Sequence, residues 1–207
     1  MAVFWDRVAG VYDIFVYGLN RKCNRTLCLL IESSVYSDDE VLECACGTGM
    51  LTESLAARCR FVLATDYSEK MLERARKKLA SKSNVRFEAA DITALPYADH
   101  SFDRVVAANV IHLLDDPKAA LSELLRVCRP GGQLIIPTYV SRAENGRERL
   151  LSRLLSRIGV SFKNRFSYES YQQFIREAGY EDAFFVIVEG RIPCALAYIP
   201  VPEEPAE

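Results

Sequence analysis

The chain has 207 residues, of which 50% are hydrophobic and 26% are charged, and its formal net charge at pH 7 is -2. This composition is ordinary for a globular protein, and the length suits one α/β domain with modest additions. The near-zero charge gives no electrostatic reason to expect binding to nucleic acid or to an anionic membrane. No apolar run approaches the ~20 residues of a spanning helix. Asp6, Arg7 and Asp13 interrupt the region where a signal peptide would be apolar, so we expect a cytoplasmic protein.

The seven cysteines indicate neither a disulfide framework nor a metal site. Their number is odd and they are scattered along the chain. Zinc sites usually contain two close pairs of Cys or His. Cys23 and Cys28 are separated by four residues, while Cys44 and Cys46 should lie on opposite sides of a strand. We therefore expect buried, reduced thiols.

Strand-like and helix-like segments alternate from residue 41 to residue 139. Strands are expected at 41–45, 61–66, 85–91, 102–110 and 133–139. Helices are expected at 52–58, at 69–82 after a Ser68 cap, and from Asp116-Pro117 to Cys128, where Arg129-Pro130-Gly131-Gly132 ends the pattern. This order predicts a parallel sheet with helices on both faces.

The C-terminal region follows a different pattern. A helix is expected from about Tyr168 to Ala178, followed by two strand-like runs at 183–190 and 193–201. Only a few residues separate these two runs, whereas a parallel connection needs a dozen or more. The final pair of strands must therefore be antiparallel.

Two segments fall outside the predicted sheet, within a single domain that we expect to span residues 1–207. Residues 1–34 have helical spacing and are expected to form an N-terminal helical cap. Residues 141–166 are expected to form a lid insertion with an amphipathic helix. Between Ser141 and Arg165 this insertion carries six arginines and Lys163, against Glu144 and Glu148. These charges favour either an anionic substrate or a solvated helix face.

The stretch VLECACGTGM, residues 41–50, ends the first predicted strand with two glycines. Ligands of open parallel sheets bind beyond the carboxyl ends of the strands, and glycines let the backbone approach a ligand closely. Asp66 ends the second strand, where its carboxylate can accept hydrogen bonds from two ribose hydroxyls. The nicotinamide dinucleotide fingerprint fails because Thr52 occupies its third glycine position. A plain strand-to-helix turn is the alternative interpretation.

Several ordered motifs resemble those of class I S-adenosylmethionine-dependent methyltransferases. Glu43, Ala45, Gly47 and Gly49 fit their acidic-x-Gly-x-Gly-x-Gly loop, with alanine in the first glycine place. Asp66 fits the ribose-binding acid, and Ala90-Asp91-Ile92 resembles the adenine-contacting segment. Residues 101–114 and 123–139 resemble the fourth and fifth strand motifs. Residues 5–13 resemble the N-terminal helix of the branch related to ubiquinone and menaquinone biosynthesis methyltransferases.

This resemblance, which covers about residues 5–140, implies a fold and a cofactor. The fold is a Rossmann-like seven-stranded, mostly parallel sheet with an antiparallel last strand and helices on both faces. The cofactor is S-adenosylmethionine, and the product is S-adenosylhomocysteine. The implied cofactor-binding residues are Glu43 at the amino group, Ala45, Gly47 and Gly49 along the methionine and ribose, Asp66 and Tyr67 at the ribose, Asp91 and Ile92 at the adenine, and Asn109 near the sulfonium.

Each carboxylate also has a structural alternative. Glu43 can bond the backbone at a strand end, Asp66 can cap the next helix, and Asp91 can form a surface turn. These alternatives require no ligand, so the geometry around each carboxylate decides between them.

The implied reaction is in-line attack by a small-molecule acceptor on the sulfonium methyl group. Because this methyl is already activated, positioning should supply most of the catalysis, about 7–11 kcal/mol for well-aligned reactants. A general base adds roughly 10²–10⁴-fold where the nucleophile carries a proton. His112 is the candidate base, and Tyr17 and Tyr139 are candidates to shape the substrate side. Packing is the alternative role for all three.

Two other functions compete with methyl transfer to a small molecule. The first is a catalytically silent domain that binds the cofactor or a protein partner. The second is a nicotinamide oxidoreductase, which Thr52 disfavours. An arsenite methyltransferase would be a special case of the leading interpretation, for which only Cys23 and Cys28 lie near the predicted lid. A quinone acceptor is not assigned, because Ala107-Ala108 stand where bulkier or charged residues are expected.

Overall fold

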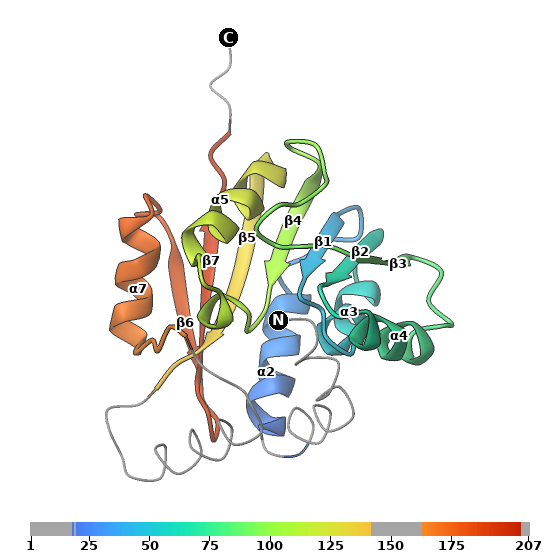
Figure 1. Ribbon diagram of the computed structural model, residues 1–207, viewed down its shortest axis with the longest axis horizontal. Helices are drawn as coiled ribbons and strands as arrows, with labels where there is room; N and C mark the ends of the chain where they lie inside the picture. Colours follow the sequence, from blue (N-terminus) through green and yellow to red (C-terminus); the bar gives the residue numbers. More distant parts are fainter. Residues whose placement is uncertain (1–17, 19, 142–162, 204–207) are drawn as a thin grey trace.

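The computed structural model describes residue 18, residues 20–141 and residues 163–203 (Figure 1). Its elements, in chain order, are α2 (Arg21–Glu32), β1 (Glu40–Cys44), α3 (Met50–Ala56), β2 (Phe61–Asp66), α4 (Glu69–Lys78), β3 (Val85–Ala89), β4 (Phe102–Ala107), the 3-10 helix η2 (Ile111–Leu113), α5 (Pro117–Val127), β5 (Cys128–Tyr139), α7 (Tyr168–Glu177), β6 (Phe184–Val188) and β7 (Cys194–Pro200). The five predicted strands and the helices between them are present up to β5, and β3 is followed directly by β4 without a helix.

One seven-stranded sheet has the order β3-β2-β1-β4-β5-β7-β6. Strands β1 to β5 pair in parallel with one another. Strand β7 is antiparallel to both β5 and β6. The predicted Rossmann-like sheet with an antiparallel last strand is therefore confirmed. The chain leaves β1 toward β2 on one side and returns with β4 on the other, so the strand order reverses between β1 and β4.

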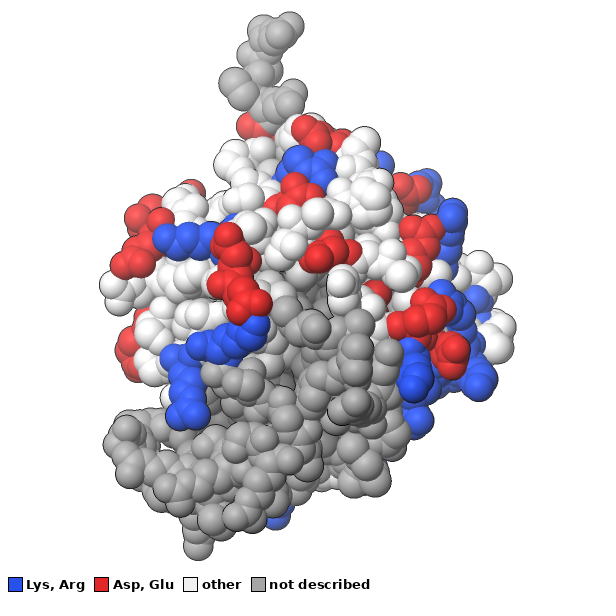
Figure 2. Space-filling view, viewed as in Figure 1, with Lys and Arg blue, Asp and Glu red and all other residues white. Residues whose placement is uncertain are grey.

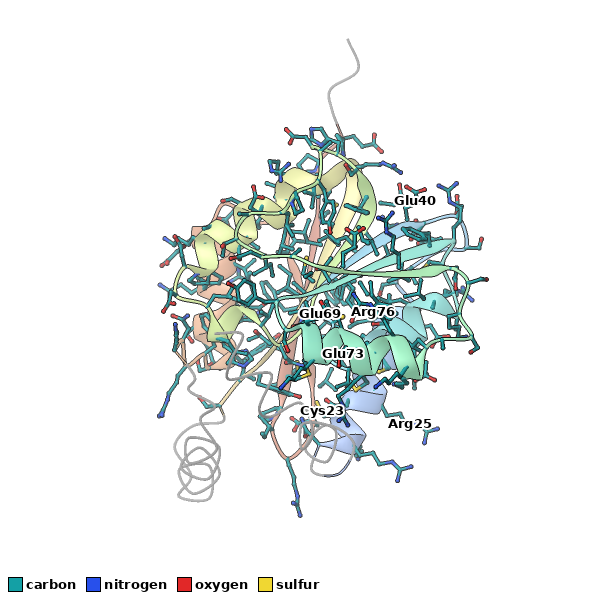
Figure 3. All side chains as sticks on the ribbon, turned by 45° about the vertical axis from the view of Figure 1, so that its right-hand side comes forward. Cys23, Arg25, Glu40, Glu69, Glu73 and Arg76 are labelled. Carbon is teal, nitrogen blue, oxygen red and sulfur yellow. The ribbon has the colours of Figure 1, made fainter. Side chains whose placement is uncertain are left out.

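Helices cover both faces of the sheet (Figure 1). Successive residues of a strand point to opposite faces, and here the residues on both faces are apolar. Leu42 of β1 packs in a cluster with residues of α5 and α7. Its neighbour Val41 packs in a second cluster with residues of α2, α3 and α4. The helices are amphipathic: on α2, Cys23 is buried while Arg25 points outward, and on α4 the exposed Glu69 pairs with Arg76 (Figure 3).

Strand β5 begins at Cys128, five residues earlier than predicted. Phe102 pairs with Cys128 and Arg104 with Gln133, so residues 129–132 form a bulge against β4. Gly131 and Gly132 exchange backbone hydrogen bonds with Val201 after β7. The Pro-Gly-Gly signal of a turn was therefore overridden by pairing with a distant segment. Strands β3 and β4 also end earlier than predicted, and α4 ends at Lys78.

The two segments outside the sheet are described only in part. Helix α2 confirms the helical prediction for residues 21–32, whereas the rest of the predicted cap up to residue 17, with Tyr17, lies outside the described residues. Most of the predicted lid, residues 142–162, also lies outside them. At the ends of the predicted lid, Ser141 forms a β-bridge with Ser167, and the Asn164 backbone N–H donates to the His112 carbonyl. Within the described ranges, every helix is too short or too polar to span a membrane.

Candidate functional site

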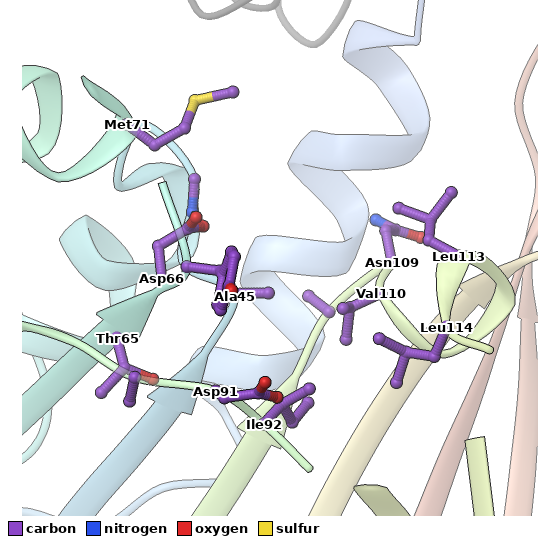
Figure 4. Close-up of a pocket in the computed structure, with 14 residues that line it drawn as sticks. Ala45, Thr65, Asp66, Met71, Asp91, Ile92, Asn109, Val110, Leu113 and Leu114 are labelled. Atoms are coloured by element: carbon purple, nitrogen blue, oxygen red, sulfur yellow. The ribbon is translucent and has the colours of Figure 1, made fainter. Parts of the chain in front are cut away.

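A cavity of about 300 Å³ opens beyond the carboxyl ends of β1, β2 and β4 (Figure 4). This is the place where the strand order reverses, and ligands of open α/β sheets bind there. It is lined by Ala45, Gly47, Thr65, Asp66, Tyr67, Met71, Ala90, Asp91, Ile92, Ala108, Asn109, Val110, Leu113 and Leu114. The structure thus brings seven of the predicted cofactor-binding residues together: Ala45, Gly47, Asp66, Tyr67, Asp91, Ile92 and Asn109.

The glycine loop holds an unusual backbone over a short distance. Ala45, Gly47 and Gly49 have φ values of 57°, 56° and 80°, all in the left-handed region. This conformation is free for glycine but costs other residues roughly 1–2 kcal/mol. Ala45 therefore adopts the backbone of the glycine it replaces and adds a methyl group beside the cavity.

Gly49 serves the packing of helices in the described structure. It precedes α3, and a Cβ atom at this position would lie 3.1 Å from Leu79 Cδ1 and 3.3 Å from Ala75 Cβ. Gly49 thereby allows the start of α3 to approach α4. It is not among the residues that line the cavity, so its contact with the cofactor stays a prediction.

The Asp66 carboxylate lies between the glycine loop and the start of α4. Its Oδ2 accepts from the Gly47 backbone N–H at 2.8 Å, and its Oδ1 accepts from the Ser68 N–H at 2.8 Å. The helix cap itself is Ser68, whose side chain accepts from the Met71 N–H. These bonds hold the carboxylate in the wall of the cavity, where a carboxylate can accept hydrogen bonds from ligand hydroxyls.

Asp91 and Ile92 form another wall of the cavity. Asp91 is exposed, and its Oδ1 accepts from the backbone N–H and the hydroxyl of Thr93, at 2.9 and 2.7 Å. The surface turn considered as an alternative is therefore present, and the same carboxylate lines the cavity. Ile92 is buried beside it, while Tyr67 is 55% exposed. A flat apolar group with a polar edge fits these neighbours.

Glu43 lies outside the lining of the cavity. It is 1% exposed, and its Oε2 accepts a hydrogen bond of 2.6 Å from Thr52 Oγ1. Burial raises the pKa of Glu43 to about 8, and the Thr52 hydroxyl opposes this rise. In the sequence Thr52 stands out only as a departure from the dinucleotide fingerprint, and no local pattern predicts its bond to Glu43. The predicted contact of Glu43 with an amino group stays a prediction.

Asn109 follows β4 with a left-handed backbone of φ 53°. Its N–H donates to the Pro137 carbonyl at 2.8 Å, and its Oδ1 lies 3.7 Å from Cys194 Sγ. These contacts fix Asn109 between β5 and β7. The apolar residues Val110, Leu113 and Leu114 then complete this side of the cavity.

The candidate catalytic residues are not among the lining residues of the cavity. His112 is 2% exposed, with Nδ1 at 3.5 Å from Thr138 Oγ1, and burial lowers its pKa to about 3. The Tyr139 ring lies 5.9 Å from the His112 ring, and its hydroxyl donates to Asn24 Oδ1 at 3.4 Å. Tyr17 is outside the described residues. Catalytic roles for His112, Tyr17 and Tyr139 therefore stay predictions.

Most lining residues that the sequence did not reveal are apolar. They are Met71, Ala108, Val110, Leu113 and Leu114, together with the polar Thr65, whereas Ala90 belongs to the predicted adenine-contacting segment. Their types are those of any buried core, so only their positions on β2, on α4 and after β4 could have suggested them. Among the described residues no three Cys, His, Asp or Glu side chains are arranged to hold a metal ion.

The donor set fits an adenosyl cofactor. Asp66 offers acceptors for vicinal hydroxyls, Asp91 an acceptor beside an apolar wall, and the left-handed loop a close backbone approach. Residues 42–136 match the family model described as methyltransferase domain. The chain is also 32% identical over 192 residues to a protein of Mycobacterium sp. (strain JLS), covering 86% of this chain and 80% of that protein. The chain belongs to the class I S-adenosylmethionine-dependent methyltransferases.

Several of the sequence relatives share one name. The Mycobacterium protein is a demethylmenaquinone methyltransferase, as is a Clavibacter sepedonicus protein with 43% identity over 98 residues, or 47% of this chain. The chain spans 40% of the Clavibacter protein and 58% of a Renibacterium salmoninarum relative.

Solved structures support the fold alone. A methyltransferase from Thermotoga maritima, titled a possible histamine N-methyltransferase, has a TM-score of 0.73 at 21% identity, covering 96% of this chain and 100% of that one. The [4+2]-cyclase SpnF has a TM-score of 0.72 at 18% identity, covering 87% and 82%. Since a protein titled a cyclase has this fold, the fold does not decide the reaction.

Proposed function

We propose that this chain transfers the methyl group of S-adenosylmethionine to a small-molecule acceptor and forms S-adenosylhomocysteine. The observation that carries the proposal is the convergence of Asp66, Asp91 and the glycine loop on one cavity where the strand order reverses. Sequence relatives named methyltransferases support the reaction.

The cofactor is held by residues of four strand ends. The Asp66 carboxylate, which lines the cavity, accepts from the ribose hydroxyls, and Tyr67 covers the rim. Asp91 accepts from the adenine amino group, with Ile92 against the ring. Backbone groups of Ala45 and Gly47 lie along the methionine part. This arrangement points the reactive end of the ligand toward Asn109 and the apolar wall.

Positioning supplies most of the catalysis in this proposal. When bound, the cofactor would supply a methyl group activated by the positive sulfonium, and the residues around the cavity would align the acceptor with it. A proton on the acceptor's nucleophile would pass to His112 or to water. His112, with its pKa lowered to about 3, is a neutral and weakly basic imidazole at neutral pH. It can receive a proton but contributes less driving force than a base whose pKa is near 7. Tyr139 and Tyr17 shape the acceptor side.

A quinone-like ring is the first acceptor to test. Val110, Leu113 and Leu114 give the cavity an apolar wall suited to a flat, neutral ring. The relatives named demethylmenaquinone methyltransferases support this class. A second candidate is an acyl carboxylate, since an Erwinia pyrifoliae relative, 38% identical over 138 residues, is named a malonyl-[acyl-carrier protein] O-methyltransferase. The arginine-rich segment 141–165 favours an anionic acceptor of this kind.

Transfer of a labelled methyl group tests the proposal. The chain is incubated with labelled S-adenosylmethionine and, in separate reactions, with demethylmenaquinone, malonyl-acyl-carrier protein or a metabolite extract. Labelled quinone is the expected product, and the Asp66→Ala variant should form less of it. Binding of S-adenosylhomocysteine without transfer to any acceptor would identify a silent cofactor-binding domain and contradict the proposal.

We also infer a cytoplasmic protein that acts as one domain over residues 1–207. All seven cysteines are free thiols, which suits a reducing compartment. On the face shown in Figure 2, acidic and basic side chains of the described residues are interspersed, which favours a small-molecule acceptor over nucleic acid.

A further inference from the structure

A buried hydrogen bond joins the two ends of the glycine loop. Glu43, near the end of β1, accepts from the hydroxyl of Thr52, in the first turn of α3, at 2.6 Å. Thr52 is 0% exposed and Glu43 is 1% exposed. Residues 45–49 run between these two positions. The bond therefore closes the base of the loop inside the protein, away from the cavity.

The loop needs to be held from several sides. The left-handed backbone of Ala45, which is not a glycine, persists only where the surrounding contacts over-determine it. The Cys46 N–H donates to the Thr65 carbonyl, and the Gly47 N–H donates to Asp66, so β2 holds one side. The bond between Glu43 and Thr52 holds the side toward α3.

The charge state of Glu43 suits a hydrogen bond to Thr52 better than an ion pair with the amino group of the cofactor. Burial raises the pKa of Glu43 to about 8; nearby Asp66 adds to the rise, whereas the hydroxyl and backbone N–H of Thr52 and the ammonium of Lys78 oppose it. At neutral pH the protonated acid therefore predominates. Like an amide, it offers one acceptor oxygen and a donor.

We propose that Glu43 and Thr52 form a brace that positions the glycine loop, and that Glu43 acts on the cofactor through this loop rather than by ionic contact with its amino group. The inference rests on the proposed function, because adenosyl ligands report the shape of the loop. Thr52 is then a positioning residue with no ligand contact of its own.

Two ligands and three variants test the brace. S-Adenosylhomocysteine contains the amino acid part, whereas 5′-methylthioadenosine contains adenosine and sulfur without it. Calorimetry at neutral pH measures both affinities for the unmodified chain, Thr52→Val, Thr52→Ser and Glu43→Gln. Thr52→Val should lower the affinity for both ligands on the order of 10-fold, because the loop loses a buried hydrogen bond. Thr52→Ser and Glu43→Gln preserve the bond and should keep the affinities of the unmodified chain.

Thermal unfolding shows which variants are folded. Thr52→Ala removes the same hydroxyl and takes the place of Thr52→Val if that variant does not fold.

The contrary outcomes are distinct. Weaker S-adenosylhomocysteine binding by Glu43→Gln, with unchanged 5′-methylthioadenosine binding, would reveal ionic contact with the amino group and overturn the brace. Unchanged affinities in folded Thr52→Val would overturn it as well. An unmodified chain that binds neither ligand contradicts the proposed function itself, and the brace with it.

Discussion

The Asp66 carboxylate accepts a hydrogen bond of 2.8 Å from the backbone nitrogen of Gly47. The two residues come from neighbouring strand ends, and both line the cavity. Because the other Asp66 oxygen accepts from Ser68, the carboxylate links the glycine loop to the start of α4. Asp66 thus shapes one wall of the cavity, and its contact with a ribose is a proposal that substitution can test.

Replacing Asp66 should weaken cofactor binding in steps. Asp66→Ala removes every acceptor and should reduce S-adenosylhomocysteine affinity by about 1.5–3 kcal/mol, the range for a hydrogen bond to a charged group. Asp66→Asn keeps one acceptor oxygen and should lose less. Calorimetry measures the affinities, and circular dichroism establishes that each variant is folded. A folded Asp66→Ala variant with unchanged affinity would falsify the ribose role.

Ala45→Gly should stabilise the protein. Relief of the left-handed alanine gains roughly 1–2 kcal/mol, and the more flexible unfolded chain costs about 0.4–1 kcal/mol. The free energy of unfolding, measured in urea, should therefore rise by about 0.5–1 kcal/mol. Ala119→Gly, in the first turns of α5, is the matched control and should lower it by a similar amount. Equal losses for both variants would show that Ala45 is not strained.

Glu43 should make the protein less stable as pH rises. Its ordinary pKa of 4.5 applies to the unfolded chain, whereas the folded value is about 8, so the stabilisation it provides at low pH is lost progressively between these values. Glu43→Gln cannot lose a proton, so its stability should rise relative to the unmodified chain between about pH 5 and pH 8. Urea unfolding at both pH values measures this difference. A constant difference would mean that Glu43 is ionised in the folded protein.

The groups around Glu43 set the direction of this effect. Asp66 on β2 raises its pKa, Lys78 on α4 lowers it, and the thiols of Cys28, Cys44 and Cys46 lie within its electrostatic reach. Burial is the largest cause. The predicted dependence therefore survives substitution of any single neighbouring thiol.

Burial of His112 should lower the free energy of unfolding as the pH decreases. Its pKa falls from 6.5 to about 3 on burial, so the unfolded chain binds a proton first as pH decreases between these values. His112→Gln should therefore lose less free energy of unfolding than the unmodified chain between about pH 6.5 and pH 4. His100→Gln, at the other and exposed histidine, is the control substitution. Equal acid sensitivity of His112→Gln and the unmodified chain would contradict a buried neutral imidazole.

Local patterns were sufficient to predict most of the sheet. The apolar run at 61–66 is β2 residue for residue, and Asp116 caps α5 through its bond to the Ala119 N–H. The start of β5 was wrong because Gly131 and Gly132 bond to Val201, some 70 residues away in the chain. Pairing with a distant segment leaves no local signal, so residues 129–132 were interpreted as a turn before β5 rather than as part of the strand. The predicted end of the preceding helix at Cys128 agrees closely with its observed end at Val127.

The site was predictable where it depends on strand ends. Asp66, Asp91 and the glycine loop meet because parallel strands carry their carboxyl ends to one edge. The left-handed backbone of Ala45 was not predictable, since alanine has no preference for it. The hydrogen bond between Thr52 and Glu43 was also not predictable from the sequence, because it depends on how α3 packs over β1.

The most direct measurement is a calorimetric titration of the unmodified chain with S-adenosylhomocysteine and, separately, with NAD. The account predicts one-to-one binding of S-adenosylhomocysteine, weakened by Asp66→Ala, and no heat of binding from NAD. Binding of NAD alone, or of neither ligand by the folded protein, would contradict the assignment of the cavity to an adenosyl sulfonium cofactor.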